Sequence, residues 1–400
     1  MDQRFRQLFN SQFTPAIYEQ YVRELSRRLD TTFEFRLAET PLFLSDDFKQ
    51  KATDSANAIM DQLCNPALIE RMKAAIPERW NTPGMDALPN LAQVDFAVVR
   101  DADGTLVPKL IELQGFPSLT SLQVIQRDVW KDTIAQLDGL DVAWSCWYSG
   151  YDRESFLDLA RRTIVGQHDP AEVILMDLDP PSQKTYPDFA ATKLLFDVDA
   201  IDPTSLVRRG KQLFRANGTP VRRIYNRVVF DELIQKGVTL PFDYREELDV
   251  EWAPHPNWYW VWSKYSLPFL DHPSVPRATF VSELDRIPDD LSRYVLKPLF
   301  SFAGGGVNIE PTRADIDAIP ESDRHAWCLQ EKIEYEPALQ AVDGGGVKIE
   351  IRLMFLRPDD EAKPILAQNL VRLSRGKMLG VDFNKQFTWV GSSVALSTDS

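Results

Sequence analysis

The stretch Tyr294-Val-Leu-Lys-Pro-Leu-Phe-Ser-Phe-Ala-Gly-Gly-Gly-Val-Asn308 decides the fold that the sequence predicts. It begins as a short apolar strand, and Pro298 suits the strand end because proline cannot donate to a sheet ladder. Glycines follow Lys297, and apolar residues alternate again from Val307. The pattern predicts a β-hairpin with a bare tip, whose backbone N–H groups can approach phosphate oxygens. An ordinary turn beside a solvated lysine is the alternative, and no Walker motif follows the glycines.

The composition is that of a globular protein with room for two or three domains. The chain has 400 residues, of which 44% are hydrophobic and 26% charged, and its formal net charge is −14. This charge argues against a nucleic-acid or membrane-surface protein, and no apolar run of about 20 residues predicts a transmembrane helix. The N-terminus lacks the apolar core of a signal peptide. Three widely spaced cysteines fit a reducing compartment, so we expect a cytoplasmic protein.

The order of predicted elements favours a mixed α/β fold in three parts. Residues 1–90 are expected to form a helical region and residues 91–205 an α/β substrate domain, which opens with a β-hairpin. Residues 206–400 are expected to form a nucleotide-binding domain, with 295–310 as its lid. The last residues, 396–400, have the composition of a polar tail.

Polar residues at the ends of two predicted strands suggest a substrate pocket. Glu112 and Gln114 stand two apart, so a strand would present both side chains on one face. A solvated strand face and a helix N-cap near Ser118 are the alternative. The apolar run 172–176 predicts a buried strand, and open α/β sheets bind ligands at polar loops such as 177–188, at the carboxyl ends of strands.

A charged stripe on an otherwise apolar strand marks a second candidate region. Glu350 and Arg352 alternate with apolar residues along 347–356, and a charged face is costly unless it meets water, a partner or a ligand. A solvated sheet face is an equal alternative. Asp382 and Asn384 also stand two apart, although a polar turn is common there. Four histidines show no metal-type spacing, so carboxylate and amide oxygens are the candidate metal ligands, which favours Mg²⁺.

Taken in chain order, these features resemble the ATP-grasp superfamily, with the unpermuted motif order of glutathione synthetase. The matching residues are Lys264, Lys297, Ser301, Gly304, Gly305, Gly306, Gln330, Glu331, Glu350, Arg352, Arg372, Asp382 and Asn384. The resemblance implies an α+β ATP-grasp fold in which the two lysines hold the ATP phosphates and the glycine hairpin closes over them. It also implies that the residues Gln330 and Glu331 lie beside the adenine.

The same resemblance implies roles for the charged residues further along the chain. Glu350, Asp382 and Asn384 would hold Mg²⁺, and Arg352 or Arg372 would stabilise the transferring phosphoryl group. The final motif departs from the family, because the usual Glu-x-Asn is Asp-x-Asn here. The shorter side chain puts direct metal contact by Asp382 in question.

The segment 109–122 is similar to the pre-ATP-grasp domain of glutathionylspermidine synthases and related proteins. Gln114 stands where those proteins have asparagine. The similarity implies that residues 91–205 form a pre-ATP-grasp domain. It also implies that Glu112, Gln114, Ser118 and Arg227 face the substrate.

The resemblance implies an ATP-dependent ligase that joins a small-molecule carboxylate to an amine or a thiol through an acyl phosphate. ATP and Mg²⁺ are the expected cofactors. One alternative is a small-molecule kinase on the same fold. Another is a non-catalytic nucleotide-binding module, which the departure at Asp382 favours. The sequence identifies neither substrate and leaves the oligomeric state open, a homodimer included.

Overall fold

The structure is a computed structural model, and it describes residues 1–300, 306–376, 384 and 386–398. The helices are α1 (Gln3–Gln12), α2 (Pro15–Leu29), α3 (Asp46–Leu63), α4 (Pro66–Met72), α5 (Leu122–Ile134), α6 (Arg153–Ile164), α7 (Tyr186–Phe196), α8 (Phe230–Lys236), α9 (Trp258–Val261) and α10 (Arg313–Asp317). The strands are β1 (Leu42–Phe43), β2 (Leu91–Arg100), β3 (Leu106–Gln114), β4 (Trp144–Ser145), β5 (Val173–Met176), β6 (Asp199–Ile201), β7 (Val207–Arg209), β8 (Gln212–Phe214), β9 (Pro220–Val221), β10 (Arg223–Asn226), β11 (Glu251–Ala253), β12 (Ala278–Phe280), β13 (Tyr294–Pro298), β14 (Trp327–Glu331), β15 (Leu339–Gln340), β16 (Gly346–Leu356), β17 (Ile365–Ser374), β18 (Gly391–Ser393) and β19 (Ala395–Thr398). Helices and several sheets together confirm the mixed α/β class that the sequence predicts.

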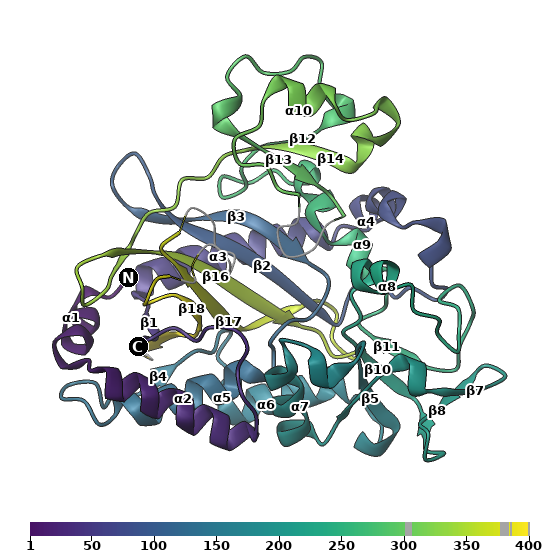
Figure 1. Cartoon of the computed structure of the whole chain (residues 1–400), viewed down its shortest axis with the longest axis horizontal. Helices are drawn as coiled ribbons and strands as arrows, with labels where there is room; N and C mark the ends of the chain where they lie inside the picture. The colour runs from purple at the N-terminus through teal and green to yellow at the C-terminus, as the bar shows by residue number, and fades with distance from the viewer. Residues whose placement is uncertain (301–305, 377–383, 385, 399–400) are drawn as a thin grey trace.

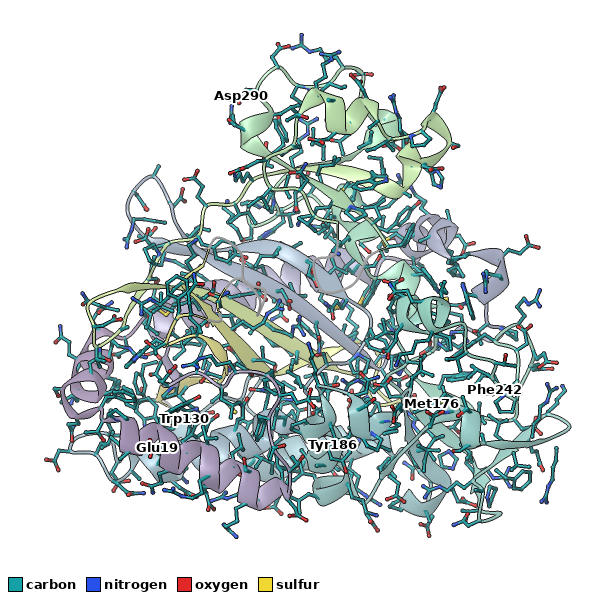
Figure 2. The ribbon with its side chains drawn as sticks, viewed as in Figure 1. Glu19, Trp130, Met176, Tyr186, Phe242 and Asp290 are labelled. Atoms are coloured by element: carbon teal, nitrogen blue, oxygen red, sulfur yellow. The ribbon has the colours of Figure 1, made fainter. Side chains whose placement is uncertain are left out.

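An antiparallel sheet with the strand order β18-β17-β16-β2-β3 lies at the centre of the molecule (Figure 1). Helix α3 packs against β3, α5 against β17 and α6 against β16. Tyr21 of α2 stacks on Trp130 of α5, with ring centroids 3.9 Å apart. Figure 2 labels Trp130 among the side chains of this region. The central strands therefore lie in a large apolar core, where any charged side chain needs a partner.

A second sheet, with the order β11-β10-β5-β6, is parallel throughout. Strand β5 is apolar and buried along its whole length, as strands of parallel sheets commonly are. Both sheets combine segments from the two sides of the boundary expected at residue 205, because β5 pairs with β10 and β2 pairs with β16. Such pairing between distant segments is not visible in local sequence patterns. The polar residues Asp177 and Arg227 follow directly after the carboxyl ends of β5 and β10.

A small antiparallel sheet with the order β12-β14-β13 stands above the central sheet in Figure 1. It has an apolar core of its own, formed by Val281, Leu296, Ile316, Ile319 and Leu329. Leu296 and Leu329 face this core together with Ile316 of α10, whereas Cys328, the neighbour of Leu329 on β14, belongs to a different apolar cluster. The small sheet is thus a separate unit that carries Lys297.

The glycine hairpin expected after β13 is closed by one pair of residues. Leu296 and Asn308 exchange two backbone hydrogen bonds of 2.9 Å, in place of the second strand that the alternation from Val307 predicts. Gly306 has a φ of +71°, and a Cβ there would lie 3.0 Å from Pro298 Cγ, so glycine is required at this position. Ser301, Gly304 and Gly305 lie outside the described residues, and the role of 295–310 as a lid stays a prediction.

The two ends of the described chain meet. Strand β19 pairs with β1 near the N-terminus and with β4, and Leu396 is fully buried. The prediction of a polar tail at 396–400 is therefore wrong for residues 396 and 397, because a distant strand supplies the burial that local composition did not indicate. Among the described helices, none is long and apolar enough to cross a membrane.

Candidate active site

A polar stripe crosses the middle of the central sheet. Asp95 of β2 lies opposite Glu112 of β3 on one side and opposite Arg352 of β16 on the other. The guanidinium of Arg352 donates from Nε to Asp95 Oδ1 over 2.7 Å and from Nη2 to Asp95 Oδ2 over 2.5 Å. Arg372 of β17 donates to Asp95 Oδ2 over 3.1 Å and pairs with Glu350, which lies opposite it on β16. Asp95 is fully buried and Glu350 is 1% exposed, so this is not a solvated face.

A β-bulge in β3 lets the small sheet reach this stripe. The register between β2 and β3 pairs Asp95 with Glu112 and Phe96 with Leu110, which leaves Ile111 as the extra residue. Lys297 Nζ donates to the Ile111 carbonyl over 3.1 Å. Because the extra residue of a bulge lies outside the ladder, its carbonyl is available to accept this bond. Lys297 therefore spans from the small sheet to the central sheet.

Lys264 approaches the same region from a third segment. It begins the 3₁₀ helix Lys264–Phe269, is 6% exposed, and lines a small cavity together with Glu112 and Gln114. Gln114 Nε2 donates to Glu112 Oε1, which confirms that the two side chains share one face of β3. Gln114 Oε1 is buried and has no hydrogen-bond partner in the described part of the chain. It is an oxygen that can accept a hydrogen bond from a ligand.

The charges in this region act on one another. Burial lowers the pKa of the Lys297 amino group, against the opposing fields of Glu112 and Glu350. Burial would raise the pKa of Glu112, but Lys264, Arg372 and Arg352 outweigh it and hold that pKa below its usual range. Burial also raises the pKa of Glu350. The charged residues singled out from the sequence come from five segments, and in the structure they affect one another's pKa values.

Gln330 and Glu331, the pair expected beside an adenine, lie on β14, the middle strand of the small sheet. Gln330 is opposite Ala278 on one side and Val295 on the other, and it is 1% exposed. Its Nε2 is buried without a hydrogen-bond partner among the described residues, which is uncommon and marks a donor open to a ligand. Glu331 is exposed and accepts a hydrogen bond from the Arg277 N–H over 3.2 Å.

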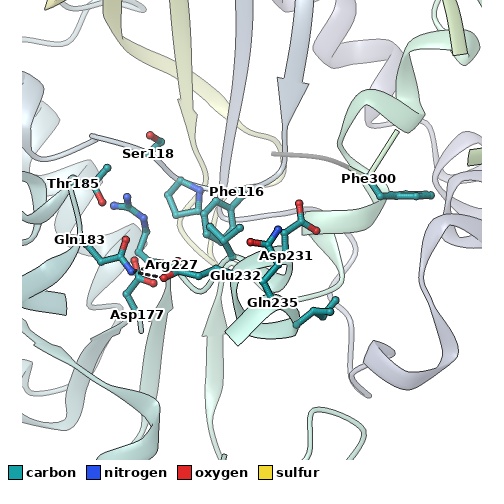
Figure 3. Close-up of a pocket in the computed structure, with 13 residues that line it drawn as sticks. Phe116, Ser118, Asp177, Gln183, Thr185, Arg227, Asp231, Glu232, Gln235 and Phe300 are labelled. Carbon is teal, nitrogen blue, oxygen red and sulfur yellow. Dashed lines mark hydrogen bonds between the residues drawn. The ribbon is translucent and has the colours of Figure 1, made fainter. Parts of the chain in front are cut away.

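A larger cavity of about 590 Å³ opens beside this region (Figure 3). It is lined by Phe116, Pro117, Ser118, Asp177, Gln183, Thr185, Arg227, Val229, Asp231, Glu232, Ile234, Gln235 and Phe300. It shares Phe116 and Phe300 with the small cavity at Lys264, so the two spaces adjoin. The predicted substrate residues Ser118 and Arg227 thus lie together at the carboxyl ends of β5 and β10. Glu112 and Gln114 line the adjoining cavity instead.

Arg227 is held by a fully buried carboxylate. Its Nη1 donates to Asp188 Oδ2 over 2.5 Å, and Asp188 Oδ1 accepts from the N–H groups of Ser121 and Leu122 at the start of α5. Three donors therefore satisfy Asp188, and the guanidinium is fixed at the cavity wall. This arrangement positions Arg227 toward a ligand without leaving an unpaired charge.

Comparisons with known proteins bear on the fold. No family model and no curated protein matches the chain. Among solved structures, the apo form of a glutathione synthetase-like effector from Globodera pallida matches 91% of this chain and 95% of its own, with a TM-score of 0.60 and 14% identity. The chain has a glutathione synthetase-like fold. At this identity the likeness concerns the fold alone.

Two of the three metal ligands expected on this glutathione synthetase-like fold, Glu350 and Asn384, contact other groups of the protein. Asn384 Oδ1 accepts hydrogen bonds from Ser374 Oγ, Arg375 N and Gly376 N over 2.9–3.0 Å, and Glu350 is paired with Arg372. Asp382 lies outside the described residues. Over the ranges that the structure describes, no group of three or more His, Cys, Asp or Glu side chains is arranged to hold a metal ion. The described ligands Glu350 and Asn384 thus contact neighbouring protein groups, and the Mg²⁺ site that the sequence predicts stays a prediction.

Some residues of the polar stripe and of the region around the larger cavity were not singled out from the sequence. Asp95 sits in an apolar strand, and the cost of a buried charge that drew attention to Glu350 applies to Asp95 equally. Asp188 and Glu232 lie on helices, where single acidic residues are common, and no sequence signal separates them from solvated ones. Their roles depend on how the glutathione synthetase-like fold brings α5, α7 and α8 together.

We expect Asp177→Asn to change how stability depends on pH. Burial raises the pKa of Asp177 from 3.8 to about 7, so the folded protein keeps this carboxyl protonated where the unfolded chain ionises it. The stabilisation is complete below about pH 4 and is lost as the pH rises to about 7, by up to about 4 kcal/mol. Denaturant titrations at pH 5 and pH 8 should show a larger loss in the original protein than in Asp177→Asn.

The exposed Asp179, two residues along, provides a matched control. It has a φ of 41°, a conformation that asparagine tolerates, so Asp179→Asn should fold normally. We expect Asp179→Asn to keep the original pH dependence. Equal pH dependence in the original protein and both variants would contradict the assignment to Asp177.

Proposed function

We propose that this protein is an ATP-dependent ligase that joins a small-molecule carboxylate to an amine or a thiol. The observation that carries the proposal is the position of Lys297. Its amino group, carried by the small sheet, bonds to Ile111 O on the central sheet and lies in the field of Lys264, Glu112 and Glu350. Two buried lysines between two sheets are suited to binding a polyphosphate. Its negative charges compensate for the water that the two ammonium groups lost on burial.

The two arginines have different surroundings and, we propose, different roles. Arg352 is buried and gives two hydrogen bonds to Asp95, so it supports the stripe. The side chain of Arg372 is 41% exposed, although it contacts Glu350 and Asp95. Arg372 therefore retains donor capacity on its open side, and we assign it to the transferring phosphoryl group.

The proposed chemistry has two steps. A substrate carboxylate oxygen attacks the γ-phosphorus of ATP, a P–O bond forms, and ADP leaves. The amine or thiol of the second substrate then attacks the acyl carbon, loses a proton, and releases inorganic phosphate. No side-chain nucleophile is required, because Lys264, Lys297 and Arg372 contribute by binding charge and excluding water from the acyl phosphate.

Two further parts of the proposal concern the contact of Gln330 with the nucleotide base and the Mg²⁺ that accompanies ATP. The unpaired Nε2 of Gln330 supports a hydrogen bond to the nucleotide base, with Glu331 at the open edge. Mg²⁺ enters as the cation that accompanies ATP in solution, and no step is derived through it, since Asp382, one of its three expected ligands, lies outside the described residues.

The test is ADP release from ATP in the presence of pooled carboxylates and pooled amines or thiols. We expect release that requires one member of each pool. With heavy oxygen in the substrate carboxylate, we expect the label to appear in inorganic phosphate. ADP release without label transfer would favour the kinase, and nucleotide binding without ADP release from any pool would favour the non-catalytic module. Either result would overturn the ligase.

A further inference from the structure

Asp177 is a buried carboxylate without a cationic partner, and it faces the larger cavity. It follows the last residue of β5, is 4% exposed, and accepts a 2.8 Å hydrogen bond from the Leu178 N–H. Over the part of the chain that the structure describes, no lysine, arginine or histidine forms an ion pair with it. The ionised form of a carboxyl group in this position is unfavourable unless a positive charge arrives from outside the chain.

Two neighbouring acidic residues, Asp188 and Glu232, already have ion-pair partners. Arg227 is paired with the fully buried Asp188 over 2.5 Å. Glu232 is paired with Lys236 over 2.6 Å and also accepts a hydrogen bond from Gln183 Nε2 over 3.1 Å (Figure 3). After these pairs are counted, Asp177 remains an acidic group without an ion-pair partner among the described residues, and Asp231 is a further acidic residue of the lining.

Apolar residues also line the cavity. Phe116, Val229, Ile234 and Phe300 line it together with the polar residues. A volume of about 590 Å³ accommodates a small organic ligand. The cavity therefore combines an acceptor for one positive charge with room for an apolar body.

We propose that the larger cavity binds a ligand with a primary ammonium group attached to an apolar body, and that the ammonium binds to Asp177. The proposal names the chemical class of one substrate, and its link to catalysis rests on the proposed ligase. Binding itself requires neither ATP nor turnover.

The experiment is calorimetric titration of the full chain, without nucleotide, with 2-phenylethylamine as the probe. Its neutral and anionic analogues are 2-phenylethanol and 3-phenylpropionate. We expect both analogues to bind at least about tenfold more weakly than the amine, because they lose a charge-assisted hydrogen bond. Equal binding of the alcohol, or failure of the amine to bind, would overturn the proposal.

Two variants separate the carboxylate from its surroundings. We expect Asp177→Asn, which keeps the acceptor for Leu178 N–H, to weaken 2-phenylethylamine binding at least about tenfold. Asp179→Asn should leave it unchanged. Unchanged affinity in Asp177→Asn would overturn the proposal, and unfolding melts of both variants verify that each is folded.

The pH dependence gives an independent readout. The charged and titratable groups that act on Asp177 or respond to it are Arg227 directly after β10, Glu232 and Lys236 of α8, and Tyr244 in the loop after α8. Ionisation of Asp177 near pH 7 should tighten amine binding between pH 6 and pH 8, while the amine stays protonated. Asp177→Asn should remove this dependence, and a dependence that persists in the variant would contradict the role of Asp177.

The two proposals fail separately. If no pool supports ADP release but the amine binds through Asp177, the ligase falls and the ammonium site stands. If ADP release depends on Lys297 but amine binding is insensitive to Asp177→Asn, the ligase stands and the ammonium site falls.

Discussion

Lys297→Met is expected to lower kcat/KM for ADP release by about 10²–10³-fold, because one fixed positive charge at the phosphates is removed. Methionine keeps most of the length of the side chain and avoids the burial of a charge. Lys297 is 8% exposed and its pKa is lowered by burial, so its ammonium group does not stabilise the empty fold. Thermal unfolding of the variant should therefore match or exceed that of the original protein.

The decisive measurement for Lys297 is the shift of the unfolding temperature that ATP produces. We expect ATP to raise the unfolding temperature of the original protein and to have little effect on Lys297→Met. The control is Lys363→Met, at an exposed lysine that pairs with Asp61 on the surface, where both ATP binding and turnover should be unchanged. Equal stabilisation of Lys297→Met and the original protein by ATP would contradict a role for Lys297 at the phosphates.

Local patterns predicted many of the elements because they are decided by local physics. Helix α3 lies in the helical region expected over residues 1–90; its Ser45 accepts a hydrogen bond from the Phe48 N–H, and two acidic residues occupy its first turn. The alternation over 347–356 is β16. The burial of Leu396 could not be predicted, because its partner strand β1 lies at the other end of the sequence. Strand pairing across the chain is decided by packing, not by neighbouring residues.

The candidate site was likewise predictable only in part from the sequence. The cost of a buried charge identified Glu350 and Arg352 from the sequence, and both are buried. Their partners could not be predicted, because the pairing of Asp95 with Arg352 requires β2 beside β16. The bulge at Ile111, which receives Lys297, likewise leaves no signal in a single sequence. Residue types at a site follow from chemistry, whereas their contacts follow from topology.

Asp95→Ala is expected to reduce the free energy of unfolding by about 3–5 kcal/mol. Asp95 is fully buried and accepts two hydrogen bonds from Arg352 and one from Arg372. Its removal leaves the buried guanidinium of Arg352 without its carboxylate. Denaturant titration measures the change, and Asp61→Ala, at the exposed pair with Lys363, should change stability by no more than about 1 kcal/mol.

A double variant tests whether the loss comes from the unpaired charge. Because replacing both members of a buried pair by apolar residues of similar volume is often neutral, Asp95→Leu with Arg352→Met should recover most of the lost stability. At a temperature where the original protein and the double variant are both folded, the double variant should retain measurable ADP release.

Arg372→Met should instead lower kcat by about 10²-fold, since Arg372 is assigned to the phosphoryl group. If the double variant stays as unstable as Asp95→Ala, or if Arg372→Met keeps its full kcat, the division of roles between the two arginines is wrong.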